Sequence, residues 1–191
     1  MFQSDRKMEK TKKMWQMVPT DKVTHKIETL DVQRNQISCI PENLFAGCDW
    51  SSLKKLYLGQ NILGSLSENI CDTSNNILGF LKHVPNIEVL DLSDNKFKYV
   101  PSFTNNHQII ALNMSNNQLR NWTTDIRQFV SLKVLDLSGN KIQYLDSVTT
   151  NGLDELNEKN NSTPVVLDLR RNVLRCDCQT LHFIKWINST R

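Results

Sequence analysis

One pattern recurs six times along the chain and constrains its fold more than any other feature. The pattern is L-x-x-L-x-L-x-x-N-x-L, in which L stands for an apolar residue, and only Pro164 departs from it. The asparagine recurs at steps of 26, 34, 22, 23 and 32 residues, which indicates an internal repeat with two insertions. The six copies are residues 27–37, 53–63, 87–97, 109–119, 132–142 and 164–174.

The centre of each copy predicts a short strand, because side chains alternate between the two faces of a strand. Two apolar residues of each strand are expected to point inward: Leu30/Val32, Leu56/Leu58, Leu90/Leu92, Leu112/Met114, Leu135/Leu137 and Leu167/Leu169. A single repeat cannot bury its apolar face alone, so successive strands should stack into one parallel sheet.

The asparagine of each copy follows the strand, where the chain bends. A buried amide at this point can donate to and accept from backbone groups of adjacent turns, which satisfies polar groups that burial would otherwise isolate. The sequence therefore predicts a structural asparagine ladder of Asn35, Asn61, Asn95, Asn117, Asn140 and Asn172.

The residue between the two inward side chains should face outward on the concave side. These candidate binding residues are Asp31, Tyr57, Asp91, Asn113, Asp136 and Asp168. Four aspartates in the row suggest a stripe for a cation or a basic ligand. We favour the simpler interpretation, in which solvated aspartates belong to the common repeat sequence, although a concave sheet face is a usual binding surface of solenoids.

The copies at this spacing resemble the leucine-rich repeat family, whose period is about 20–29 residues. The resemblance implies an α/β solenoid, a horseshoe with about six short parallel strands on the concave face and loops or short helices on the convex face. Insertions are expected near residues 68–80 and 147–162, and the polar second insertion is predicted to be a surface loop. The chain is predicted to consist of a basic N-terminal segment (residues 1–26), the repeats (residues 27–175) and a C-terminal cap (residues 176–191).

Residues 1–26 carry seven Lys/Arg and three Asp/Glu, a net charge of +4. The whole chain has a net charge of +3, so residues 27–191 have a net charge of −1. A near-neutral body argues against nucleic-acid binding by the folded part. We favour a degenerate repeat or a disordered segment for residues 1–26, and a membrane-surface segment is the alternative.

The last copy continues into N-x-L-x-C-x-C-x-x-L-x-F-x-x-W. This motif resembles the cysteine-containing C-terminal cap of extracellular leucine-rich repeat proteins, and CDCQTLHFIKW is most similar to the cap of invertebrate Toll-like receptors. The resemblance implies that Cys176 and Cys178 are half-cystines paired with later cysteines, and no cysteine follows before Arg191. We therefore expect a chain truncated within its cap. Leu181, Ile184 and Trp186 predict a short amphipathic helix over the last turn.

Three further cysteines leave alternatives open. Cys48 takes a position that usually points inward, which favours a buried free thiol, and a Cys48–Cys71 bridge is the alternative; Cys39 has no assigned partner. Cys176, Cys178 and His182 are three metal-ligand types, but a structural zinc site takes four ligands, so a metal fragment is disfavoured.

The sequence contains five N-x-[ST] acceptor motifs, at Asn113, Asn121, Asn160, Asn161 and Asn188. Asn160 or Asn161 is expected to be the most accessible. A glycan on Asn113 would obstruct the concave face and shift ligand contact to a flank.

The sequence predicts a recognition module without a cofactor. It has no nucleophile elbow, P-loop or H-E-x-x-H motif, and its four histidines are scattered, so an enzyme is not expected. No run of about 18 apolar residues is present. The resemblance implies part of a Toll-like receptor ectodomain, with a protein or microbial ligand, a receptor dimer, and membrane attachment through downstream sequence. The alternatives are another extracellular adhesion or guidance protein and a cytosolic scaffold.

Overall fold

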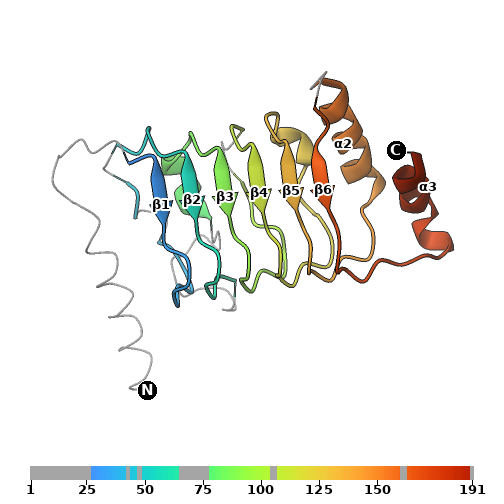
Figure 1. Cartoon of the computed structure of the whole chain (residues 1–191), viewed down its shortest axis with the longest axis horizontal. Helices are drawn as coiled ribbons and strands as arrows, with labels where there is room; N and C mark the ends of the chain where they lie inside the picture. Colours follow the sequence, from blue (N-terminus) through green and yellow to red (C-terminus); the bar gives the residue numbers. More distant parts are fainter. Residues whose placement is uncertain are drawn as a thin grey trace, which may run out of the picture.

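The computed structural model describes residues 27–41, 44–46, 49–64, 78–103, 107–159 and 163–189. In this described part of the chain, six three-residue strands form one parallel sheet in chain order (Figure 1). This arrangement confirms the predicted α/β repeat solenoid. The strands are β1 (Thr29–Asp31), β2 (Lys55–Tyr57), β3 (Val89–Asp91), β4 (Ala111–Asn113), β5 (Val134–Asp136) and β6 (Val166–Asp168).

The leucine at the middle of each strand pairs in register with the leucine of the next strand. In β2 to β5 these leucines are at most 1% exposed, whereas Leu30 and Leu167 in the two outer strands are only partly buried. These leucines thus form a continuous apolar column on the inner face of the sheet. The column is less buried in the two outer strands than in the middle ones.

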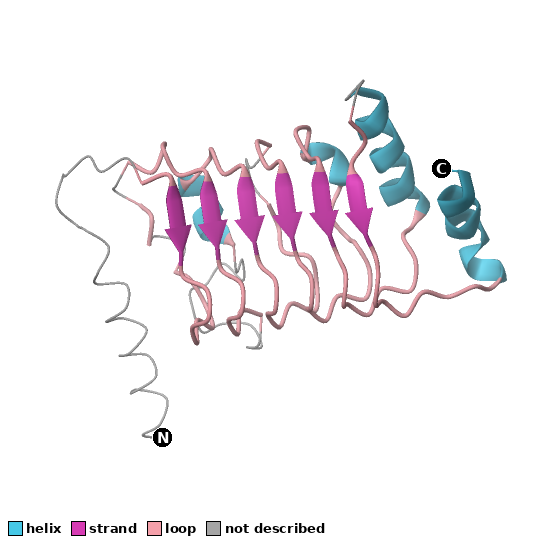
Figure 2. Cartoon of the chain, viewed as in Figure 1, coloured by secondary structure: helices cyan, strands magenta, loops and turns pink. Residues whose placement is uncertain are grey.

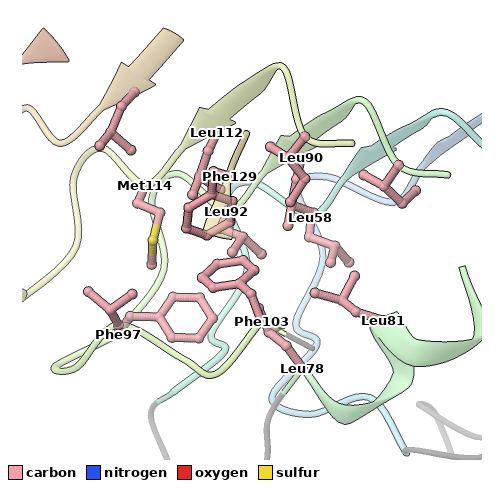
Figure 3. Close-up of a cluster of buried hydrophobic side chains, with 14 of the residues drawn as sticks. Leu58, Leu78, Leu81, Leu90, Leu92, Phe97, Phe103, Leu112, Met114 and Phe129 are labelled. Carbon is pink, nitrogen blue, oxygen red and sulfur yellow. The ribbon is translucent and has the colours of Figure 1, made fainter. Parts of the chain in front are cut away.

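Aromatic side chains fill the space behind the leucines. Phe97, Phe103 and Phe129 lie among leucines of successive turns (Figure 3), and the rings of Phe103 and Phe129 meet edge to face at 5.1 Å. Burying one such ring contributes about 2 kcal/mol. The core is therefore shared between turns, which explains why a single repeat is not stable alone.

The side of the solenoid opposite the sheet carries loops and short helices, as expected (Figure 2). Two 3₁₀ helices lie there, η1 (Gly79–His83) and η2 (Ile126–Gln128). Asp125 caps η2 by accepting a hydrogen bond from the backbone N–H of Arg127. The remainder of the first predicted insertion, residues 68–77, lies outside the described residues.

The second insertion is a helix, and our prediction of a surface loop was wrong. Helix α2 (Ser147–Lys159) begins after Asp146, whose Oδ1 accepts a 2.8 Å hydrogen bond from the backbone N–H of Thr149. Thr149, Leu153 and Leu156 are buried. Their i, i+4, i+7 spacing forms one narrow apolar stripe. Only two of these residues are strongly apolar, so the stripe was easily missed among polar neighbours.

Gly152 allows α2 to pack closely against η2. A Cβ atom at Gly152 would lie 2.5 Å from Cγ2 of Ile126. Arg127 of η2 also forms an ion pair with Glu155 of α2, at 3.5 Å. The helix is therefore held by the preceding repeat.

The chain ends in η3 (Cys178–Thr180) and helix α3 (Leu181–Ser189). A helix was predicted here, but its buried face is different. Phe183 is 1% exposed, Leu181 is 49% exposed, and Trp186 is partly buried. The capping box between Asp177 and Thr180 fixes where η3 begins, and α3 follows η3 directly. None of the described helices has the length and apolar character needed to cross a bilayer.

Candidate binding face

Two rows of outward-facing side chains run across the sheet. The first strand positions of β3 to β6 align in register and form what we call the apolar row: Val89, Ala111, Val134 and Val166. The third strand positions contain all six predicted concave-face residues, aligned from strand to strand: Asp31, Tyr57, Asp91, Asn113, Asp136 and Asp168. We call the four members from β3 to β6 the acidic row.

The acidic row has a structural role that the sequence analysis missed. In five of the six strands, Oδ1 of the third residue accepts a hydrogen bond of 2.8–3.0 Å from the backbone N–H two residues later. Asp and Asn form this local turn readily, because their short side chains reach the backbone two positions on. The aspartates are therefore not merely solvated: these four aspartates and Asn113 each close the end of their own strand.

The second carboxylate oxygen differs along the row. Oδ2 of Asp91 accepts a hydrogen bond from Gln33, and Oδ2 of Asp168 accepts one from Arg170. Oδ2 of Asp136 has no hydrogen bond to any residue that the structure describes. Asp136 thus presents an acceptor for a cation supplied by a partner.

Asp168 is paired within the chain. The hydrogen bonds from the Arg170 side chain and backbone hold the pKa of the Asp168 carboxyl below its ordinary value, and the same contact raises the pKa of Arg170. Arg170 is 86% exposed at its side chain. The pair is therefore well screened by water and contributes little to stability.

The apolar row becomes more exposed toward the C-terminal strands. Val134 is 42% exposed and Val166 is 61% exposed, and Ile110, directly before β4, is 39% exposed. Each is a β-branched side chain whose exposed surface a partner could remove from water. The face therefore places exposed apolar side chains beside a carboxylate that still has a free oxygen.

The asparagines behind this face connect successive turns. The side-chain amide of Asn117 donates to the carbonyls of Met114 and Ser115 in its own turn and of Leu92 in the preceding turn, and Oδ1 accepts from Phe97 N. Asn61, Asn95, Asn140 and Asn172 repeat this arrangement. Among the described residues, Asn35 donates to the carbonyls of Val32 and Gln33, which belong to its own turn. These bonds hold the turns, and hence the rows, in register.

The cysteines do not form a metal site within the described residues. Cys176 and Cys178 are exposed free thiols. His182 lies 2.9 Å from the carbonyl oxygen of Leu145, and the described part of the chain contains no cluster of three metal-binding side chains. Cys39 is disulfide-bonded. Cys48 and Cys71, for which a free thiol or a mutual bridge was expected, lie outside the described residues.

The predicted glycan acceptors lie on different surfaces. Asn113 is half-buried on the concave face and its Oδ1 accepts a hydrogen bond from the backbone N–H of Ser115. Asn121 is exposed on the turn after β4, and Asn188 is exposed on α3. Asn160 and Asn161 lie outside the described residues. Modification of any of these sites stays a prediction.

Sequence reasoning overlooked the apolar row. Its signal was present, because Val, Ala, Val and Val occupy the same repeat position in the last four copies. These residues flank the leucines and were treated as variable positions. Only the register of β3 to β6 shows that they align on one outward surface.

Two segments of the chain match known repeat families. Residues 86–106 and residues 130–145 each match a family described as Leucine Rich Repeat. No curated protein matches the chain.

A solved structure has the same fold. It is titled as an octameric complex of Latrophilin 3, Unc5D and FLRT2, in which FLRT2 contributes an LRR part. A chain of that complex matches with a TM-score of 0.65 and 21% identity, over 86% of the present chain. The match covers 45% of the solved chain, so the present sequence corresponds to less than half of it. Together, the repeat matches and the six-stranded parallel sheet show that this chain has the fold of a leucine-rich repeat solenoid.

Proposed function

We propose that this chain is a non-catalytic recognition module that binds a protein partner on its concave face. The observation that carries this proposal is the exposure of Val134 and Val166, the last two members of the apolar row, beside the acidic row in β5 and β6. Apolar side chains at the centre of an interface contribute most of its affinity, while polar neighbours select the partner. The matching partner surface is apolar with at least one Lys or Arg placed to reach Asp136.

We further propose that the module belongs to an extracellular receptor, with residues 27–175 as the recognition solenoid and residues 176–191 as the start of a cap. Our first assignment is the ectodomain of a Toll-like receptor acting in innate immune recognition, which the cap motif from Cys176 to Trp186 supports. In that setting the partner is a protein or microbial ligand or a second receptor copy, and signalling depends on downstream sequence.

A second candidate is an adhesion or guidance protein. The solved relative favours it, because its title places a leucine-rich repeat part in a complex with Latrophilin 3 and Unc5D. Sequencing the transcript beyond the codon for Arg191 separates the candidates. A membrane helix followed by a Toll/interleukin-receptor domain supports the first, and an immunoglobulin-type domain supports the second.

Two matched substitutions, at Val134 and at Val148, test the binding proposal. Val134 on the concave face and Val148 on α2 are both exposed, at 42% and 57%. We expect Val134→Arg to weaken binding to any ectodomain captured from an extracellular protein array by about tenfold or more, because a buried charge without a partner is costly. Val148→Arg should leave binding unchanged. Equal loss in both variants, with unchanged melting curves, would show that the concave face is not the binding surface.

A further inference from the structure

The turns that follow the strands form a second surface with the opposite charge. Five cationic side chains lie one or three residues after a ladder asparagine: Lys96, Lys98, Arg120, Lys141 and Arg175. We call these five residues the basic flank. The turns that carry them lie side by side along the lower edge of Figure 1.

Backbone hydrogen bonds hold these turns in register. Lys96 N donates to the Leu63 carbonyl, Lys141 N to the Leu119 carbonyl and Arg175 N to the Gln143 carbonyl, at 2.8–2.9 Å. The residues between the cationic positions point into the core, since Phe97, Leu119 and Ile142 are at most 1% exposed. Side chains on either side of them must therefore point outward, and equivalent positions of successive turns form columns.

The charges of the basic flank are not neutralised within the chain. All five side chains are exposed, and none forms an ion pair with a residue that the structure describes. No Asp or Glu occupies the first, third or fourth position after a ladder asparagine in any described turn. Residues 27–191 carry a net charge of −1, so this concentration of positive charge is local and does not reflect a basic body.

The geometry of the basic flank fits a narrow linear polyanion. The cations one residue after the asparagine form one column, and those three residues after it form a second column. The two columns are about 7 Å apart, if the extended chain rises ~3.3 Å per residue. Neighbouring turns add one or two cations at a spacing close to that of paired strands, about 4.8 Å. A duplex nucleic acid is far wider than such a band.

The aromatic side chains on this surface distinguish between narrow polyanions. Tyr99 is 73% exposed and Tyr144 is 41% exposed, but Asn121 occupies the equivalent position of the turn between them. Proteins that bind single-stranded nucleic acid stack successive bases on aromatic rings. Because Asn121 separates Tyr99 from Tyr144, the two rings do not form a continuous surface on which successive bases could stack. A sugar chain with regularly spaced anionic groups therefore fits this surface better than a single-stranded nucleic acid.

We propose that the basic flank binds a linear sulfated polysaccharide. Sulfate groups would accept hydrogen bonds and ion pairs from the Lys and Arg side chains, and the exposed tyrosine rings would contact the sugar. The flank is separate from the apolar and acidic rows. Polysaccharide binding and protein binding can therefore be lost independently, and failure of one test does not decide the other.

The test uses a fluorescently labelled heparin oligosaccharide and the full chain. We expect the triple variant K98Q/R120Q/K141Q to bind about tenfold or more weakly at ~0.15 M salt, and the dependence of log K on log salt concentration to become shallower, because fewer counterions are released. The matched control K55Q/K133Q/K159Q removes three positive charges outside the basic flank. It should change the affinity by less than about twofold, because interactions over more than ~8 Å are screened at this salt concentration.

Three results would overturn the proposal. Equal weakening in the control variant would show attraction by overall charge. Weakening only on substitution of Lys7, Lys10 and Lys12 by Gln would assign heparin binding to the N-terminal segment. Tighter binding of a single-stranded thymidine oligonucleotide, lost in the same triple variant, would assign the flank to nucleic acid. Lys98, Arg120 and Lys141 are exposed, so the triple variant is expected to fold, and a melting curve of each variant checks this.

Discussion

The side-chain amide of Gln33 donates a 2.7 Å hydrogen bond to Oδ2 of Asp91, and this bond crosses over Gly59. The three residues belong to three successive turns. A Cβ atom at Gly59 would lie 3.1 Å from both bonded atoms and 2.9 Å from Oγ of Ser93. The missing side chain of Gly59 thus allows a contact between turns that are not neighbours.

We predict that Gly59→Ala lowers the free energy of unfolding by about 1 kcal/mol, because the added methyl group displaces the Gln33 side chain from Asp91. In the Gln33→Ala background the same substitution should cost less, because only the close contacts of the new methyl group with Ser93 and Asp91 remain. Urea unfolding of the two single variants and the double variant measures this coupling. Equal effects of Gly59→Ala in both backgrounds would exclude it.

The second prediction compares two ladder asparagines. Asn117→Ala removes hydrogen bonds within its own turn and to the preceding turn, and it leaves the buried backbone N–H of Phe97 without its acceptor, so it should cost about 3 kcal/mol. Asn35→Ala removes two hydrogen bonds to Val32 and Gln33, which within the described residues are its bonds as a donor, and should cost about 1 kcal/mol. Urea unfolding curves of the two variants test the difference. Equal losses would mean that the hydrogen bonds between turns contribute nothing to the free energy of unfolding.

The third prediction concerns the residue before each ladder asparagine, which adopts a left-handed backbone conformation in all six turns. Only Gly139 (φ 64°) is a glycine among them; the others are Arg34, Gln60, Asp94, Asn116 and Arg171. Gly139→Ala should cost about 1 kcal/mol, because a Cβ atom strains this conformation. The atom would also meet Oδ1 of Asn116, at the end of a side chain that can move.

A background variant separates the two causes. Asn116→Ala removes the atom that the new methyl group would meet but leaves the backbone conformation of residue 139 unchanged. Most of the loss caused by Gly139→Ala should therefore persist in the double variant, measured by thermal unfolding. Full recovery in the double variant would assign the cost to the collision.

The fourth prediction concerns pH. The contact with Arg170 lowers the pKa of Asp168 in the folded state, so its small stabilising effect is present above the ordinary aspartate pKa of about 4 and is lost as the pH falls through the lowered value. An NMR titration of the Asp168 carboxyl should show its pKa moving up toward the ordinary value in Arg170→Ala. Arg171→Ala is the control, because Arg171 is the smallest of the causes that lower this pKa. An unchanged pKa in Arg170→Ala would contradict the prediction.

The fifth prediction concerns the attachment of α3. Trp186 Nε1 donates a 2.9 Å hydrogen bond to Oδ1 of Asp154 on α2. Trp186→Phe keeps an aromatic ring but removes the donor, so it should lower the stability of the contact between α2 and α3 by about 1 kcal/mol. Hydrogen exchange should become faster in α3 while the amides of β3 and β4 keep their protection. Uniformly faster exchange would instead indicate a global loss of stability.

Much of the fold could be predicted because the repeat imposes a local rule. Inward residues such as Leu90 and Leu112 and ladder residues such as Asn117 occupy the same place in every copy. Each position depends on the turn that contains it and on the neighbouring turns. The repeated spacing of apolar residues and asparagine therefore predicted the parallel sheet, its six strands and the direction in which the strand side chains point.

The departures from prediction occur where packing decides. Residues 147–159 look like a polar loop, but Leu153 and Leu156 face the solenoid and Gly152 allows contact with Ile126. In the cap, α3 buries Phe183 rather than Leu181. Neither result follows from composition, since each depends on which surface the helix meets.

The sequence by itself determined the solenoid, its inward leucines and the outward position of the aspartates. Only the tertiary structure decided what the surfaces could do. Stacking brings Val134 beside Val166 and aligns Lys98 with Arg120, although more than 20 residues separate each pair along the chain. A binding surface is an arrangement across turns, and hydrogen bonds between turns create it by holding them in register.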